Sequence, residues 1–356
     1  MWHHGYKRDK YKNVINLIVN EENRTEYLKN NIYVNENQTV YISLEDVKNL
    51  FDSTVYYDEQ YNQIITTSDT KVANIAIDEK KMIVNNSEVG ILDSIIKIDN
   101  NIYLPISDME LVYNIKVEYI KNTNRVIIDN LNKGMIRAIV VEDTDIKFKP
   151  RGLSKNIGII KQGETVNCFY TTSKGWRQIR TNDGKIGYVK ANKLSNEYIL
   201  RQDMLEIGKT DKISLGEYKN NNFVISDSKI VIKDIFNING ANIENNNEFD
   251  ISNEEYKIWS IISNQSLNQE NEILRQILND YKSRTTFIDL IVKKAIKNNI
   301  NGISIEIVGI EDKEGIKRFV IELAPKLREI GITTCVVLNE NIQEQDYINI
   351  VDYIVE

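Results

Sequence analysis

A chain of 356 residues is too long for one ordinary hydrophobic core, so its length predicts two or three domains. Hydrophobic residues make up 41% and charged residues 27% of the chain, which is the balance of an ordinary globular protein. The net charge of -7 at pH 7 argues against a protein that follows the phosphate backbone of nucleic acid. We therefore predict no nucleic-acid partner.

Histidine and cysteine are almost absent. The two histidines, His3 and His4, are adjacent near the start of the chain, and the two cysteines, Cys168 and Cys335, fall in different predicted domains. This distribution excludes histidine-based acid–base catalysis and histidine-ligated metal sites in the rest of the chain, and it makes a disulfide improbable. No cofactor and no metal site is predicted.

Residues 1–32 are predicted to form a leader. Its apolar run from Val14 to Val19 is far shorter than the roughly 20 apolar residues that a membrane-spanning helix needs, and no signal peptide is visible. The basic run from Lys7 to Lys12 is interpreted as a solvated segment, or as the flank of a lost anchor.

An internal repeat follows the leader. Residues 40–66 match residues 102–128 without a gap, at a constant shift of 62 positions. Each copy predicts a short strand, a helix opened by Ser or Asp, and two strands joined by a polar turn. The matched pairs are Tyr41 and Tyr103, Asp46 and Asp108, Val55 and Val117, Tyr57 and Tyr119, and Asn62 and Asn124.

Residues 33–131, which contain this duplicated α+β unit, resemble the domain named for the N-terminal region of copper amine oxidases. That domain is common on extracellular proteins of Firmicutes. The name does not imply copper, because no histidine or cysteine lies in the segment. The resemblance implies a structural spacer.

Residues 134–197 predict a small β-barrel. Alternating apolar strands are expected at residues 136–141, 165–170, 176–181 and 186–189. The dipeptide Asp183-Gly184 between the last two is a strong hairpin signal. Several short strands in so few residues are typical of a small barrel.

This segment resembles bacterial SH3-like cell-wall domains through Phe148-Lys149-Pro150, residues 157–163, Gly175-Trp176 and Gly187-Tyr188-Val189. The resemblance implies binding to peptidoglycan through the barrel surface. Tyr170, Trp176 and Tyr188 are the aromatic candidates for contact with the glycan. The alternative is that Trp176 belongs to the small core.

Residues 205–356 alternate strand-like and helix-like stretches, which predicts an α/β unit with a parallel sheet. Helices are expected at residues 271–298 and 315–330. The predicted strands are Lys212–Tyr218, Phe223–Ile225, Lys257–Ser263, Gly302–Val308, Thr333–Leu338 and Tyr353–Val355.

The stretch from Asn298 to Leu338 resembles glycoside hydrolase family 18, the chitinase group, which folds as a (β/α)8 TIM barrel. The segment around Trp259 resembles the third strand of that family, and Trp259 is a further candidate for glycan binding. In the family, the fourth strand carries the motif D-G-x-N/D-x-D-x-E. Its final Glu protonates the leaving oxygen, and the Asp two residues earlier orients the acetamido group of the substrate.

Here every polar position of that motif has changed. Asn301 replaces the first Asp, Ser304 stands at the N/D position, Glu306 replaces the inner Asp, and Val308 stands where the catalytic Glu belongs. Losing a positioned general acid costs about 10²–10⁴ in rate. We therefore predict a glycan-binding pseudoenzyme and assign no catalytic residue.

Three alternatives stay open at this site. Glu306 is either an inward carboxylate held by its neighbours or a ligand for sugar hydroxyls. The third alternative is that Glu311 or Asp312 in the next loop reaches the site and rescues catalysis, in which case the chain is an active hydrolase of N-acetylglucosamine-containing glycans.

Alternation along the strand predicts that Ser304, Glu306 and Val308 share one face, whereas Ile303, Ile305 and Ile307 face the helices.

The barrel is expected to be incomplete, because residues 205–356 are fewer than the roughly 250 that eight βα units need. An open barrel exposes sheet edges, which predicts self-association unless the chain is truncated or another segment covers the gap. Together, the three resemblances predict a multidomain protein of the cell envelope or extracellular space whose partner is peptidoglycan or another cell-wall glycan.

Overall fold

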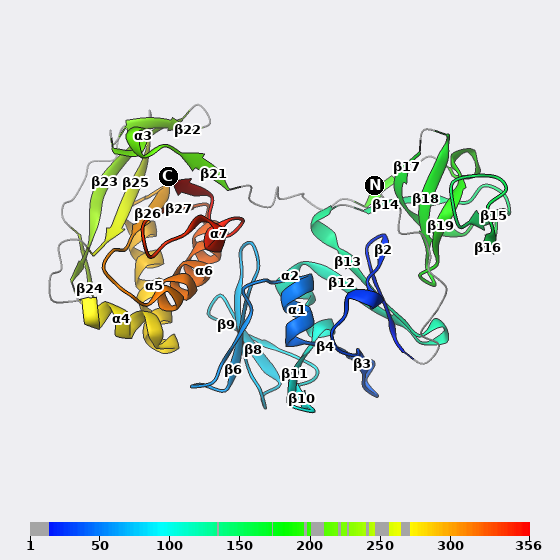
Figure 1. Ribbon diagram of the computed structural model, residues 1–356, viewed down its shortest axis with the longest axis horizontal. Helices are drawn as coiled ribbons and strands as arrows, with labels where there is room; N and C mark the ends of the chain where they lie inside the picture. Colours follow the sequence, from blue (N-terminus) through cyan, green and yellow to red (C-terminus); the bar gives the residue numbers. More distant parts are fainter. Residues whose placement is uncertain are drawn as a thin grey trace. The chain divides into compact units, whose positions relative to one another are not determined.

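The computed structural model describes residues 14–133, 135–172, 174–195, 198–200, 210–219, 222–225, 228–239, 242–245, 256–264 and 271–356 (Figure 1). The chain divides into two compact units. The first comprises residues 1–65, 74–83 and 87–205, and the second comprises residues 206–356 with the short segments 66–73 and 84–86. His3, His4 and the basic run lie outside the described residues. No helix among the described residues has the length and apolarity to cross a membrane.

Three small sheets are formed by residues 16–130, most of which belong to the first unit. Their strand orders are β12-β13-β1-β2, β10-β11-β4-β3 and β5-β6-β7-β8-β9. Two short helices, α1 (Leu44–Leu50) and α2 (Glu110–Tyr113), lie between strands. The strands are β1 (Asn16–Val19), β2 (Glu22–Asn23), β3 (Tyr33–Val34), β4 (Val40–Ser43), β5 (Tyr56–Asp58), β6 (Gln63–Thr67), β7 (Val72–Ala76), β8 (Lys81–Val84), β9 (Ser87–Gly90), β10 (Ile96–Ile98), β11 (Asn101–Pro105), β12 (Ile115–Ile120) and β13 (Arg125–Asn130).

Part of the predicted leader belongs to this fold. Strand β1 pairs in parallel with β13, and Leu17 and Ile18 are buried. The apolar run in the leader is therefore a core strand of the sheet. The folded part of the first unit begins before residue 33, the boundary that the sequence predicted.

Positions 62 residues apart make the same contacts. The Tyr57 hydroxyl donates to Asn62 Oδ1 at 2.7 Å, and the Tyr119 hydroxyl donates to Asn124 Oδ1 at 3.0 Å. Both asparagines adopt the left-handed conformation, with φ of 50°. Each hairpin thus turns on an asparagine that a tyrosine one strand away holds in place.

The aspartates of the two copies also have matching roles. Asp46 accepts a hydrogen bond from the backbone N–H of Lys29 at 2.7 Å, and Asp108 accepts one from the backbone N–H of Leu92 at 3.1 Å. In both cases a carboxylate near the start of a helix binds the loop that precedes the first strand of its copy. This carboxylate ties the loop to the helix through backbone amides.

A second buried carboxylate, Asp93, closes one end of the β10-β11-β4-β3 sheet. Its Oδ2 accepts hydrogen bonds from the Thr39 hydroxyl at 2.6 Å and the Asn35 amide at 2.7 Å, and Asn37 and Lys80 lie nearby. These donors, the Thr39 hydroxyl first, lower the pKa of Asp93 from 3.8 to about 2.

We expect the contribution of Asp93 to stability to be complete above pH 4 and to be lost as the pH falls from about 4 to about 2, because its pKa is lower in the folded than in the unfolded state. Thermal melts of the unmodified protein and of Asp93→Asn measured at several pH values test this. The difference in Tm should be largest near neutral pH and shrink toward pH 2. A difference that stays constant with pH would contradict it.

A seven-stranded antiparallel sheet forms the rest of the first unit, in the order β16-β15-β19-β18-β17-β14-β20. It contains the four predicted strands, shifted by at most two residues, and three more. The strands are β14 (Met135–Ile139), β15 (Thr144–Lys147), β16 (Asn156–Ile160), β17 (Thr165–Thr171), β18 (Trp176–Thr181), β19 (Ile186–Lys190) and β20 (Tyr198–Leu200). Because β20 pairs with β14, this sheet extends past the predicted boundary at residue 197.

At two positions of this sheet the structure requires glycine. Gly184 has a φ of +77° in the hairpin between β18 and β19, where the dipeptide with Asp183 predicts a turn. A Cβ at Gly187 would lie 2.4 Å from the side chain of Ile146 in the core. That core consists of Ala138, Val140, Ile146, Ile160, Val166, Cys168, Ile179 and Val189.

Arg180 joins this sheet to the β12-β13-β1-β2 sheet of the same unit. Its guanidinium donates two hydrogen bonds to the carboxylate of Asp129, at 2.6 and 2.7 Å, and one to the backbone oxygen of Asn20 at 2.5 Å. The Arg180 side chain is 2% exposed. A two-pronged contact of this kind fixes orientation as well as distance.

The second unit is built on one curved, half-barrel sheet with the order β21-β28-β27-β26-β25-β23-β22, and β24 pairs with β23. Its core strands run parallel, as the alternation of strands and helices predicts. The strands are β21 (Asp211–Ile213), β22 (Asn222–Ile225), β23 (Ser228–Asn239), β24 (Asn242–Asn245), β25 (Tyr256–Ser263), β26 (Gly302–Glu306), β27 (Thr333–Val337) and β28 (Tyr353–Val355).

The first strand of this unit departs from the predicted barrel. In a barrel the first strand pairs with the second, whereas here β21 pairs in parallel with β28, with Asp211 opposite Tyr353. The predicted strand Lys212–Tyr218 is a three-residue strand followed by helix α3 (Leu215–Lys219). The sheet edge that was expected to be open beside β28 is therefore covered by β21, which satisfies backbone groups that an open edge would expose.

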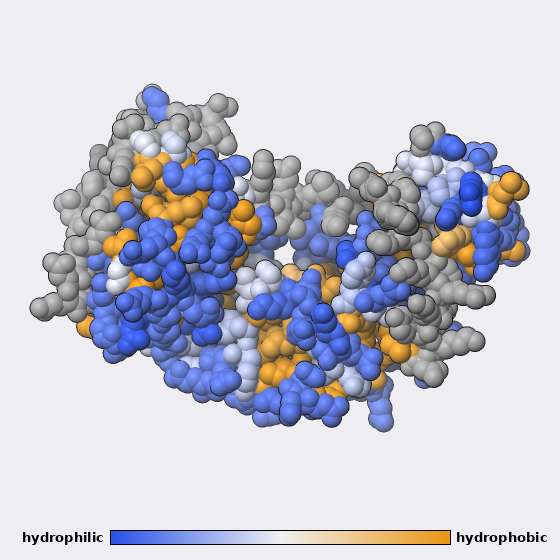
Figure 2. Space-filling view, viewed as in Figure 1, coloured by the Kyte–Doolittle hydropathy of each residue, from blue (hydrophilic) through white to orange (hydrophobic). Residues whose placement is uncertain are grey.

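Helices α4 (Asn271–Asn279), α5 (Tyr281–Lys297) and α6 (Lys313–Glu329) pack on one face of this sheet, and the short α7 (Glu344–Tyr347) follows β27. The predicted helix 271–298 is split in two, because Asp280 caps α5 by accepting from the backbone N–H of Ser283. The apolar sides of the helices form one core with Ile303, Ile305 and Ile307 of β26 and its carboxyl end. Their solvent side is largely hydrophilic in Figure 2.

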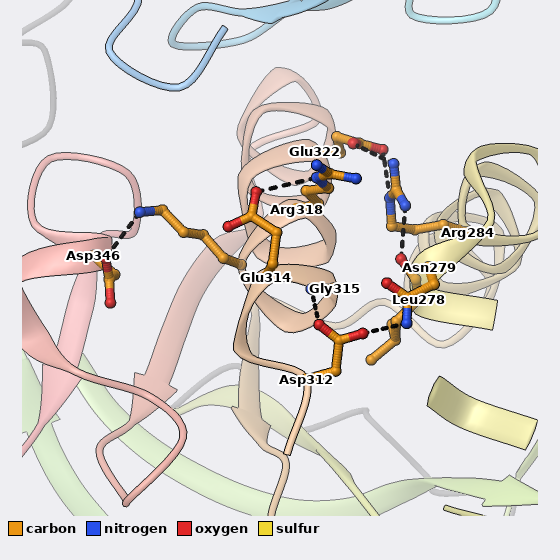
Figure 3. A network of polar contacts seen from close by, with 10 residues as sticks. Leu278, Asn279, Arg284, Asp312, Glu314, Gly315, Arg318, Glu322 and Asp346 are labelled. Carbon is orange, nitrogen blue, oxygen red and sulfur yellow. Dashed lines mark hydrogen bonds and ion pairs between the residues drawn. The ribbon is translucent and has the colours of Figure 1, made fainter. Parts of the chain in front are cut away.

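A buried ion pair joins the three helices (Figure 3). Arg284 of α5 donates from Nε and Nη2 to the carboxylate of Glu322 on α6, at 3.1 and 2.9 Å. The same guanidinium donates to the backbone oxygen of Leu278, near the end of α4, at 2.6 Å. Both charged side chains are 1% exposed, so each depends on the other for its solvation.

Breaking this pair should destabilise the second unit. We expect Arg284→Met or Glu322→Leu to lower the free energy of unfolding by about 3–5 kcal/mol, because each leaves a buried charge alone. The double variant should recover most of that loss. Arg318→Met, which removes an exposed pair with Glu314, is the control and should cost at most about 1 kcal/mol. Urea unfolding measures all four, and a double variant as unstable as the sum of the singles would contradict the expectation.

Candidate functional site

The four positions that the sequence analysis aligned with the hydrolase motif, Asn301, Ser304, Glu306 and Val308, lie on β26 and directly before and after it. Ile303, Ile305 and Ile307 are fully buried against the helices. Ser304 points to the opposite face of the sheet, as alternation along the strand predicts. We call this opposite face the inner face. The apolar cluster on it consists of Ile213, Tyr218, Ile230, Ile232, Trp259, Cys335, Val337 and Val355.

Ser304 is covered by an aromatic ring. The hydroxyls of Ser304 and of Tyr218 in α3 form a hydrogen bond of 2.8 Å, and Ser304 is fully buried. Burial raises the pKa of the Tyr218 phenol well above its ordinary value, and burial raises the pKa of the adjacent Cys335 thiol to about 12. These groups therefore stay protonated and neutral at physiological pH. Tyr218 was missed as a site residue because the sequence placed it in a strand.

Trp259 also belongs to this buried cluster. The ring is 2% exposed and lies 5.4 Å from the ring of Tyr353, centroid to centroid. A Cβ at Gly302 would lie 2.4 Å from Trp259 Nε1 and 2.6 Å from the hydroxyl of Thr333. The glycine that this chain retains from the motif thus makes room for an indole. Trp259 has no free ring face for stacking on a sugar.

Asn301, directly before β26, makes hydrogen bonds that hold neighbouring strands together. Its side-chain oxygen accepts from the backbone N–H of Ile258 at 2.9 Å, and its backbone oxygen accepts from the N–H of Thr333 at 3.0 Å. It therefore binds the strands on both sides of β26. This position lies at the amino end of the strand, away from the edge at which parallel sheets usually place their ligands.

Glu306 and Val308 lie at the opposite, carboxyl end. Both are half-buried. Asn264, which follows β25, accepts from the backbone N–H of Val308 at 2.9 Å and donates to its backbone oxygen at 2.7 Å. This two-way contact fixes the backbone at Val308, the position that the sequence analysis aligned with the catalytic Glu of the hydrolase motif. The valine side chain there has no proton to donate.

A cavity of about 490 Å³ lies next to this edge. It is lined by Asn271, Glu272, Arg275 and the loop 309–312. Asp312 is engaged in capping α6, because it accepts from the backbone N–H of Gly315 at 3.0 Å (Figure 3). Glu272 pairs with Arg275, whose proximity lowers the pKa of that carboxyl. Glu311 is an exposed carboxylate in the lining.

The aromatic candidates of the seven-stranded sheet are buried as well. Trp176 and Tyr188 are 5% and 3% exposed. Both alternate with the core residues Ile179 and Val189, so they lie on the face of the sheet opposite that core. The Lys190 ammonium lies 4.7 Å from the centre of the Trp176 ring. Neither aromatic ring is available to a glycan, and the side chain of Tyr170 lies outside the described residues.

Within the described parts of the chain, no group of three or more His, Cys, Asp or Glu side chains is arranged to hold a metal ion.

Two substitutions at the carboxyl end of β26 test its geometry. Ile307→Glu should destabilise the protein by several kcal/mol, because it buries a charge among the helices. Val308→Glu should be tolerated, because that side chain is half-buried at a polar edge. Thermal melts measure both. Equal losses, or a larger loss at residue 308, would show that the faces of β26 are assigned the wrong way round.

Comparison with known proteins gives one family match. Residues 19–128 match the family described as "Copper amine oxidase N-terminal domain". The match begins inside the predicted leader, in agreement with the position of β1, and it covers under a third of the chain. None of the curated proteins matches the chain.

Solved structures similar to this chain include glycosidases. The protein ydhD of Bacillus subtilis, described as a sporulation-specific glycosylase, is 18% identical with a TM-score of 0.31, over 36% of this chain and 50% of that one. A chitinase from Chromobacterium violaceum is 16% identical with a TM-score of 0.31, over 35% and 47%. The spore cortex-lytic enzyme SleL of Bacillus cereus is 24% identical with a TM-score of 0.25, over 28% and 25%. The chain thus spans half or less of the length of these structures.

Proposed function

We propose that this chain is a non-catalytic protein of the cell envelope that binds peptidoglycan or a related cell-wall glycan. Its C-terminal unit is a degenerate relative of family 18 glycoside hydrolases. The observation that carries the loss of catalysis is the hydrogen bond between Tyr218 and Ser304, together with Val308 at the position of the general acid. The binding half rests on the resemblance of residues 134–197 to bacterial SH3-like domains.

Two observations support the absence of family-type chemistry at this strand. The general acid is replaced by an alkyl side chain, and its loss costs about 10²–10⁴ in rate. The inner face of the sheet is filled by the rings of Tyr218 and Trp259. Tyr218 engages the hydroxyl of Ser304, which stands at one of the polar positions of the motif.

Self-association through an open sheet edge remains a further proposal. The edge beside β28 is paired with β21, and the sheet stays open, with β21 and β22 as its outer strands. We keep peptidoglycan or a related glycan as the proposed partner. The location at the cell envelope is part of the same proposal.

An active hydrolase is the second candidate, and the cavity beside Glu311 favours it. Glu311 is an exposed carboxylate in a concave site at the carboxyl edge of the sheet, which is where α/β proteins place ligands. In this candidate Glu311 replaces the lost acid. Release of a chromophore from an N-acetylglucosamine substrate, abolished by Glu311→Gln and kept in Glu314→Gln, would establish it and overturn the non-catalytic proposal.

Binding is tested by sedimentation with purified peptidoglycan from which phosphate-containing polymers have been removed. We expect the protein to pellet with the glycan well above the level seen with an inert insoluble polysaccharide such as cellulose. The glycan should remain intact, with no new reducing ends after prolonged incubation. A pelleted fraction equal to the cellulose control would refute the binding half of the proposal.

A further inference from the structure

The seven-stranded sheet contains a cavity that none of the aromatic candidates lines. It is open to solvent, has a volume of about 500 Å³, and is lined by Lys174, Gly175, Lys190, Ala191, Asn192 and Lys193. Three of these six residues are lysines, and none is acidic. The lining therefore offers ammonium donors without a carboxylate of its own.

The residues that line this lysine cavity belong to two short segments, the turn at Lys174-Gly175 and residues 190–193. Gly175 has a φ of +69°, and its backbone N–H donates to the oxygen of Thr172 at 3.1 Å. The backbone N–H of Ala191 donates to the oxygen of Gly175 at 2.9 Å, which joins the two segments. The lysines thus extend from backbone that hydrogen bonds hold in place, on both sides of the cavity.

The ammonium groups differ in their contacts. The Lys190 ammonium lies 4.7 Å from the centre of the Trp176 ring, a cation–π contact that restrains it. Lys193 pairs with Glu142, which neutralises part of its charge. Lys174 is exposed at the rim. With Glu142 counted, the surroundings of the cavity keep a net positive charge.

The net charge of residues 134–197 is also positive. Residues 134–197 contain twelve lysines and arginines but six aspartates and glutamates, a net charge of +6, whereas the complete chain carries -7. The positive charge is therefore concentrated in this sheet. Such a local field attracts anions even when the protein as a whole is acidic.

We propose that the lysine cavity binds phosphodiester groups of an anionic wall polymer. Lysine binds phosphate as a compact point charge, and the lining offers three ammonium groups and no carboxylate. The proposal rests on the wall-associated function, and it adds a ligand class and a site. It assigns the glycan strand to another surface, because Trp176 and Tyr188 are buried.

The test uses the full chain and a short oligo(glycerol phosphate), with binding measured by titration calorimetry at low and at physiological ionic strength. We expect binding that weakens as salt rises, because the contacts are between charges. The double variant Lys174→Gln/Lys190→Gln should reduce affinity about tenfold or more, since it removes two of the three ammonium groups of the lining. No binding at low salt would overturn the proposal.

The matched control is Lys149→Gln/Lys155→Gln. It removes the same charge from two exposed lysines of the same sheet, and Lys149 also lies near an aromatic ring, that of Phe148. We expect a loss of less than about twofold, because these lysines do not line the cavity. Equal losses in the two double variants would overturn the proposal, since they would indicate a diffuse field.

A single-stranded oligonucleotide with the same number of phosphates separates two classes of partner. Weaker binding than that of the glycerol phosphate oligomer supports the proposal, and tighter binding overturns it in favour of nucleic acid. The outcome is independent of the sedimentation assay, in which the peptidoglycan carries no phosphate polymer. Calorimetry can therefore fail while sedimentation succeeds, or the reverse.

Discussion

A parallel sheet that does not close into a barrel has two faces and two edges to cover, and the second unit is organised by that constraint. Helices α4, α5 and α6 cover one face, and the Arg284–Glu322 pair joins α5 to α6. Tyr218 and Trp259 cover part of the other face. In a complete barrel the inner side chains lie against those of the opposite strands. Here Tyr218 and Trp259 take that place.

Several features of this fold are readable from sequence because they depend on neighbours along the chain. Alternation places Ile303, Ile305 and Ile307 against the helices, and Asp183-Gly184 predicts its hairpin. The pairing of β21 with β28 and the cover of Ser304 by Tyr218 depend on partners far away in sequence, and no local pattern carries them. The burial of Trp176 and Tyr188 could not be predicted from the sequence either. Alternation predicts which face of the sheet a side chain lies on, but not whether another segment covers that face.

Asparagine has a structural role that composition alone hides. Among the described residues, nine of the eleven non-glycine positions with positive φ are asparagines, including Asn62 and Asn124 at matching hairpins. Asparagine enters the left-handed region at low cost because its short amide bonds to nearby backbone. Asparagine thus stands at turn positions where many proteins have glycine. At the two matching hairpins, the asparagine side chain accepts a hydrogen bond from a tyrosine, which a glycine could not do.

The parallel pairing of β21 with β28 also constrains the order in which the second unit can form. Asp211 and Tyr353 are neighbours in the sheet although most of the unit separates them in sequence. A chain emerging from the ribosome can assemble β23, β25, β26 and β27 with their helices step by step, since these strands are neighbours in sequence order. Strand β21 must wait for β28 to be synthesised. Closing so long a loop is slow, so we expect β21 to dock later than the strands that lie between the two in sequence.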